Sequence, residues 1–159
     1  MARLFRSAFA VAVVSMLVLG VAVVAEDSNL GTWKLNLAKS KFSPGPAPKS
    51  QTLRVEAWGA DGVKYTADGV DGEGKPMHWE LQAKYDGKLT PFKGNPDADM
   101  LAYKRIDANT VESTTQFKGK PTVRGTVVVS ADGKTRTLTQ TGTNAKGQTV
   151  NNVVVYDKQ

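Results

Sequence analysis

The sequence contains no cysteine and only one histidine, His78. Without cysteine, no disulfide can hold the fold together, so its stability must come from a packed core. The two shortages also remove the usual ligands of zinc and iron, and we expect neither a metal nor another cofactor. The 21 basic residues are interspersed with 15 acidic ones rather than gathered in a stripe. This pattern argues against a nucleic-acid partner.

A long apolar run occurs only at the N-terminus. Arg3 and Arg6 precede the apolar residues 8–24, and Val23-x-Ala25 supplies the small side chains typical of a cleavage site. We therefore expect a signal peptide over residues 1–25, a mature protein that starts at Glu26 and has no membrane span, and a periplasmic or secreted location. The alternative is a retained N-terminal membrane anchor, because the run approaches the roughly 18 residues that can cross a bilayer.

Beyond residue 25 the chain shows strand patterns and no convincing helix. Asp-Gly pairs at residues 61–62, 71–72, 86–87 and 132–133 are typical of tight turns. The runs between turns, rich in Val, Thr, Tyr and Trp, predict strands over Thr32–Leu37, Thr52–Ala57, Val63–Asp68, Met77–Tyr85, Leu89–Phe92, Met100–Ile106, Thr110–Phe117, Thr122–Ser130, Thr135–Thr141 and Thr149–Tyr156. We expect one all-β domain over residues 26–159, an antiparallel up-and-down meander of about 8–10 strands that closes as a barrel. The alternative is a β-sandwich.

Alternation assigns faces to several of these strands. In Met77–Tyr85 the apolar and polar side chains alternate, which indicates a half-buried strand. Gly125 interrupts the valine-rich Thr122–Ser130 and suggests a bend or bulge. For Thr135–Thr141 the threonine face could point to solvent or line a polar interior.

The two ends of the chain carry a resemblance. Gly-Thr-Trp-Lys-Leu-Asn at residues 31–36 and Val-Tyr-Asp-Lys at residues 155–158 look like the first and last strands of the calycin superfamily, the lipocalins and fatty-acid-binding proteins. The opening hexapeptide, with Lys-Ser-Lys-Phe at residues 39–42, is also similar to that of small exported bacterial proteins of unknown function. The resemblance implies a calycin-like barrel closed by Trp33 and Tyr156. It further implies a late arginine beside Trp33, for which Arg124 and Arg136 are the candidates.

Two departures limit what the resemblance implies about ligands. Fatty-acid-binding proteins place a helix–turn–helix lid after the first strand, whereas residues 38–50 of this chain hold Pro44, Pro46 and Pro48. Prolines at alternate positions exclude a helix there and favour an extended connection. The family also holds the lipid carboxylate with an arginine two residues before the terminal tyrosine, and here that position is Val154. The carboxylate clamp is therefore not carried over.

A barrel of 8–10 strands can hold one small molecule in a mainly apolar pocket. We predict an exported protein that holds a small hydrophobic or amphipathic molecule in the envelope, in a pocket lined by Tyr65, Trp79, Tyr103 and Arg136. The alternative is a structural or interaction protein of the envelope, with a filled core and no small ligand.

Catalytic and metal-binding patterns are weak. His78 and Glu80 share the polar face of one strand, where a solvated histidine is expected rather than a general base. The stretch Asn95-x-Asp97-x-Asp99 resembles the start of a calcium loop, but Met100 and Ile106 stand where that loop needs Gly and Glu. No pair of carboxylates has a spacing that marks a glycosidase. We therefore expect a protein that is not an enzyme.

Overall fold

The computed structural model describes residues 27–159, so the predicted signal peptide lies outside the described residues. The elements in chain order are β1 (Gly31–Leu35), the 3₁₀ turn η1 (Leu37–Lys39), β2 (Ser50–Trp58), β3 (Gly62–Val70), β4 (Pro76–Lys84), β5 (Thr90–Lys93), β6 (Met100–Arg105), β7 (Thr110–Phe117), β8 (Lys120–Val129), β9 (Thr135–Thr143) and β10 (Thr149–Lys158). Among these residues, no helix is long and apolar enough to cross a membrane.

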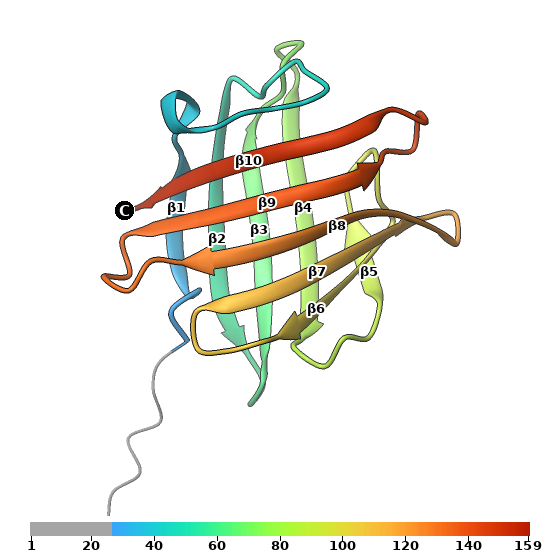
Figure 1. Cartoon of the computed structure of the whole chain (residues 1–159). Coiled ribbons are helices and arrows are strands. Elements are labelled where there is room, and N and C mark those ends of the chain that lie inside the picture. The colour runs from blue at the N-terminus through green and yellow to red at the C-terminus, as the bar shows by residue number, and fades with distance from the viewer. Residues whose placement is uncertain (1–26) are drawn as a thin grey trace, which may run out of the picture.

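The ten strands form one closed barrel, as Figure 1 shows. Each strand pairs antiparallel with the next in sequence, and β1 closes the ring by pairing with both β2 and β10. The predicted all-β meander and its closure into a barrel are confirmed, and the sandwich alternative is wrong. Each of the ten strands therefore has a paired neighbour on both sides.

The strands follow the predicted alternation closely, and their ends differ by a few residues. β1 stops at Leu35 instead of Leu37 because Asn36 caps the 3₁₀ turn, its side-chain oxygen accepting a hydrogen bond from the Lys39 backbone amide at 3.1 Å. The turn expected at Asp61-Gly62 lies one step earlier, and Gly62 already belongs to β3. Small shifts of this kind depend on side-chain caps rather than on the hydrophobic period.

Gly125 does not mark the bulge that it suggests in sequence. It pairs regularly with Ser113, and the irregularity of this strand pair lies opposite, between Thr114 and Gln116 of β7. A Cβ at Gly125 would lie 2.7 Å from the Ser113 hydroxyl oxygen. The glycine is therefore required by close packing inside the barrel.

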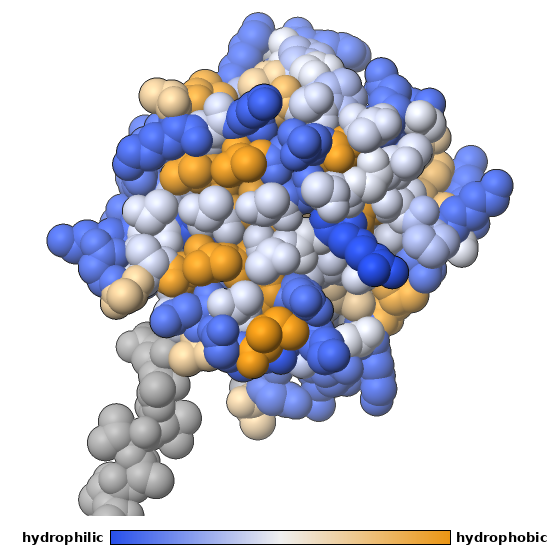
Figure 2. Space-filling view, viewed as in Figure 1, coloured by the Kyte–Doolittle hydropathy of each residue, from blue (hydrophilic) through white to orange (hydrophobic). Residues whose placement is uncertain are grey.

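The threonines of β9 face outward. Arg136 is buried, Leu138 and Gln140 line the interior, and Thr139 and Thr141 are exposed. Figure 2 shows the result on the face over β8–β10, where pale side chains lie between orange apolar groups. The ambiguity of residues 135–141 is thus resolved in favour of a solvent-facing threonine row.

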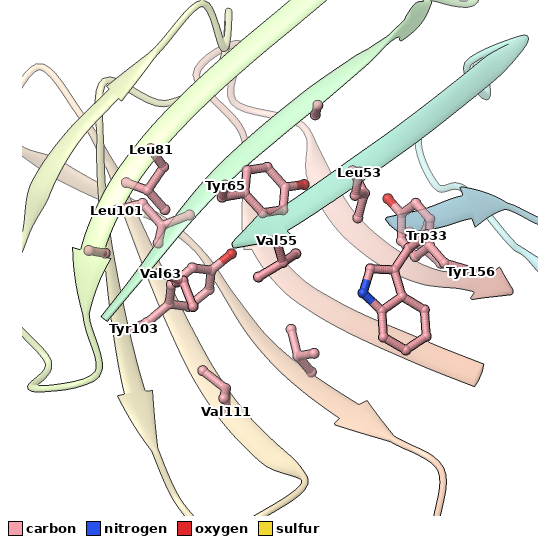
Figure 3. Close-up of a cluster of buried hydrophobic side chains, with 14 of the residues drawn as sticks. Trp33, Leu53, Val55, Val63, Tyr65, Leu81, Leu101, Tyr103, Val111 and Tyr156 are labelled. Carbon is pink, nitrogen blue, oxygen red and sulfur yellow. The ribbon is translucent and has the colours of Figure 1, made fainter. Parts of the chain in front are cut away.

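The two ends of the barrel are built differently. At one end the proline-rich connection crosses above the strands (Figure 1). Two hydrogen bonds hold it to β10. The Ser43 backbone amide donates to the Asn152 side-chain oxygen at 2.8 Å, and the Asn151 backbone amide donates to the Ser43 carbonyl. At the other end, which we call the base, residues 27–30 lead into β1. The core of buried Leu, Val, Ala, Trp and Tyr side chains lies between the ends (Figure 3).

Candidate functional site: a cavity inside the barrel

A cavity of about 510 Å³ opens at the proline-rich end and runs into the barrel. Its mouth is bordered by residues 42–48, by the β3–β4 turn, by the β5–β6 loop and by the β9–β10 turn. All four segments lie at the same end, because strand direction alternates around an up-and-down barrel. Loops far apart in sequence thereby surround one opening.

One part of the cavity wall is apolar. Trp79 of β4 and Phe92 of β5 meet edge to face, with ring centroids 6.0 Å apart and planes at 80°. Such aromatic pairs stabilise each other beyond simple burial and present a rigid apolar surface. Leucine and valine side chains complete the wall: Leu101, Val123, Val127, Leu138, Val150 and Val154.

The inner end of the cavity is polar. Tyr65 of β3, Tyr103 of β6 and Tyr156 of β10 all line it, and the Tyr156 hydroxyl donates a hydrogen bond to the side-chain oxygen of Gln51. Burial raises the pKa of Tyr65 well above its usual value, and burial likewise raises the pKa of Tyr103 and Tyr156. The three phenols are therefore neutral hydrogen-bonding groups at physiological pH.

Arg136 lies deeper than the tyrosines and is not one of the residues that line the cavity. Only 1% of the residue is exposed. Its Nε donates to the Asn29 side-chain oxygen at 2.9 Å, and its guanidinium carbon lies 5.6 Å from the centre of the Tyr156 ring. Nη1 has no hydrogen-bond partner among the described residues. A buried cation so poorly paired is unusual and energetically costly.

Trp33 is fully buried on β1, at the base. Its indole nitrogen donates to the Asn29 backbone carbonyl at 3.0 Å, and the Lys158 ammonium lies 5.1 Å from the ring centre. Of the two candidate arginines, Arg136 joins Trp33 through Asn29, whereas Arg124 is exposed on β8. Asn29 thus links the tryptophan and the buried arginine.

The residues just before β1 form a second network at the base. Asp27 binds the Arg105 guanidinium at 2.6 Å and accepts a hydrogen bond from the Tyr85 hydroxyl at 2.7 Å. Burial raises the pKa of Asp27, but these two hydrogen bonds outweigh burial and hold that pKa below its ordinary value. Nothing in the residues of this stretch shows which distant strands it contacts.

Of the four predicted pocket residues, Tyr65, Trp79 and Tyr103 lie on the cavity wall, and Arg136 lies beneath it. Contact of these residues with a ligand stays a prediction. Tyr156, predicted only as a closing residue, also lines the cavity, together with Gln51 and Ser113, which no sequence signal marked.

His78 lies on the outer face of β4, away from the cavity. Its Nδ1 lies 2.7 Å from an Asp68 carboxylate oxygen and its Nε2 3.4 Å from one of Glu80. Hydrogen bonds with these two carboxylates raise the pKa of His78. The Asn95 side chain accepts from the Asp97 amide as part of a turn. No group of three or more His, Asp or Glu residues within 27–159 has the geometry of a metal site.

No protein-family model matches the sequence, and no curated protein matches it. Solved structures do resemble the barrel. The wild-type fluorescent protein UnaG matches with a TM-score of 0.56 at 15% identity, covering 83% of this chain and 98% of that one. Zebrafish ileal bile acid-binding protein, complexed with cholic acid, matches with a TM-score of 0.51 at 13% identity, covering 83% and 99%. A redesigned β-barrel matches with a TM-score of 0.50 at 13% identity, covering 83% and 92%.

These similarities, together with the ten-strand closed meander, show that the chain shares the barrel fold of these proteins. The resemblance drawn from the two ends of the sequence is thereby confirmed at the level of the fold.

Proposed function

We propose that the protein is an exported, non-enzymatic carrier that binds one small hydrophobic or amphipathic molecule inside the barrel. The observation that carries the proposal is the 510 Å³ cavity, a volume within the range of small-molecule sites. A filled core, as the alternative function requires, would leave no such space. The cavity combines apolar and hydrogen-bonding side chains, which suits an amphipathic molecule.

The structural neighbours support the same reading. The zebrafish barrel is a bile acid-binding protein whose structure contains cholic acid. Its barrel resembles that of this chain over most of both sequences. A fold alone does not determine a ligand, so the chemistry must be tested on this cavity.

The test is a titration with Nile red, a neutral lipophilic dye that becomes fluorescent in apolar surroundings. We expect saturable binding of one dye per barrel. A Leu138→Trp variant fills the cavity and should abolish binding, whereas Thr139→Trp, the next residue on the same strand, faces solvent and should leave it intact. Binding that survives both substitutions equally would place the dye outside the barrel and overturn the proposal.

Export is tested separately. Protein purified from the envelope of its own host should begin at Glu26 when its N-terminus is sequenced. Recovery of the intact N-terminus in the membrane fraction would instead support the anchored form.

A further inference from the structure

Two of the three tyrosines at the inner end of the cavity have hydroxyls with no acceptor in the protein. The Tyr156 hydroxyl donates to Gln51, but no described residue accepts a hydrogen bond from the hydroxyl of Tyr65 or Tyr103. Tyr65 projects from β3 and Tyr103 from β6, and Figure 3 shows both phenol oxygens directed into the barrel interior. Buried polar groups in proteins normally have partners. Two free donors that face one space are therefore suited to a partner that the protein does not itself supply.

The charge beneath these tyrosines is positive. Arg136 makes no ion pair with any described carboxylate, and its Nη1 is unpartnered. The only acidic residues among those lining the cavity, Asp71, Glu73 and Asp97, lie at the mouth, in the β3–β4 turn and the β5–β6 loop. The inner end thus carries an uncompensated positive charge in surroundings of low polarity, where charges act over longer distances than in water.

We propose that the ligand enters with a hydrogen-bond acceptor first and seats an oxygen atom between the hydroxyls of Tyr65 and Tyr103, with Arg136 behind them. This inference rests on the proposed carrier function and specifies its ligand class. The ligand is an amphiphile that ends in a hydroxyl, carbonyl or carboxylate oxygen. Molecules that end in an amine are excluded, because an ammonium group can accept no hydrogen bond and is repelled by the guanidinium.

The recognition differs from a clamp on the last strand. Val154 stands on β10 at the position where the fatty-acid-binding resemblance would place an arginine, and it contributes an apolar contact to the cavity wall. The positive charge comes instead from β9, and the free donors come from β3 and β6. The acceptor site is therefore assembled from strands on different sides of the barrel.

The test compares four molecules with the same apolar chain: dodecane, dodecanol, dodecanoate and dodecylamine. Each displaces Nile red from the full mature chain, and the displacement measures its affinity. We expect dodecanol and dodecanoate to bind at least about tenfold more tightly than dodecylamine, the size of effect that one or two buried hydrogen bonds produce. If dodecanoate binds more tightly than dodecanol, the natural ligand ends in an acid. If dodecanol binds more tightly, the natural ligand ends in a neutral oxygen.

Paired variants assign the effect to residues. Tyr65→Phe with Tyr103→Phe keeps both rings and should weaken dodecanol and dodecanoate about tenfold relative to dodecane, which carries no hydrogen-bond acceptor. Arg136→Met should remove the discrimination against dodecylamine. Thr139→Val is the control, because Thr139 faces solvent on β9 and the loss of its hydroxyl should change none of the four affinities.

The possible failures are separable. If Nile red does not bind the unaltered chain, the carrier function itself fails. If Nile red binds but dodecylamine binds as tightly as dodecanol, or the double tyrosine variant leaves the series unchanged, the acceptor site is refuted and the carrier function stands.

Discussion

Replacing Asn29 with alanine should destabilise the barrel far more than its place in a short connecting segment suggests. Only 4% of Asn29 is exposed. Its side-chain oxygen accepts a hydrogen bond from Arg136 Nε at 2.9 Å, and its side-chain nitrogen donates to the Tyr85 hydroxyl at 3.2 Å. The substitution leaves the Nε of a buried guanidinium without its acceptor.

The expected loss of stability follows from the positive charge on Arg136. A hydrogen bond to a charged group contributes roughly 1.5–3 kcal/mol to stability. Because the charge of Arg136 is buried, removing its acceptor should cost an amount near the upper end of that range. We expect Asn29→Ala to lower the free energy of unfolding by about 2–3 kcal/mol. In a domain of this size the midpoint of thermal unfolding should fall by roughly 8–12 °C.

The assay is urea unfolding followed by fluorescence and circular dichroism, applied to a double-mutant cycle with Arg136→Met. Methionine removes the charge, so Asn29→Ala in that background should lose only about 1 kcal/mol. Asn151→Ala is the control for an exposed asparagine and should be nearly neutral. An equal loss in the presence and absence of Arg136 would refute the reasoning, because the two side chains would then be energetically independent.

Two further predictions concern the outer face and a loop. The neighbouring carboxylates raise the pKa of His78 in the folded state. The stabilisation that the protonated His78 provides should therefore be complete below a pH of about 6.5, and it should be lost as the pH rises through the folded-state pKa. The difference in unfolding midpoint between the wild type and His78→Gln should therefore shrink from about pH 6 to pH 8, and a difference that is constant with pH would contradict it. Gly94 has φ +79° and a Cβ there would collide with the His78 carbonyl oxygen, so Gly94→Ala should destabilise by more than about 2 kcal/mol. Gly133→Ala, at φ +69° with open space around it, should lose only about 1 kcal/mol, and equal losses at the two glycines would show that the collision has no effect.

Much of the fold could be predicted because its signals are local. Alternation such as that in Met77–Tyr85 depends only on the period of a strand, and the Asp-Gly turns depend only on backbone conformation. All ten strands were expected from these signals, and their order around the barrel follows from short connections, which make neighbours in sequence neighbours in the sheet.

The candidate site was less accessible to sequence reasoning. The aromatic wall residues Tyr65, Trp79 and Tyr103 were found because large side chains at inward positions stand out in the pattern. Gln51 and Ser113 were missed, since a polar residue in a strand carries no sign of facing inward until the register of neighbouring strands is known.

The sequence by itself determined the class of fold, through strand periodicity, turn residues and the Gly-x-Trp opening of the first strand. Only the tertiary structure decided that the interior holds a cavity. Closure of β1 onto β10 brings Asn29 against Arg136, 107 positions later in the chain, and creates the space between Tyr65 and Tyr103. Such contacts depend on the packing of distant segments, and no local pattern in the chain encodes them.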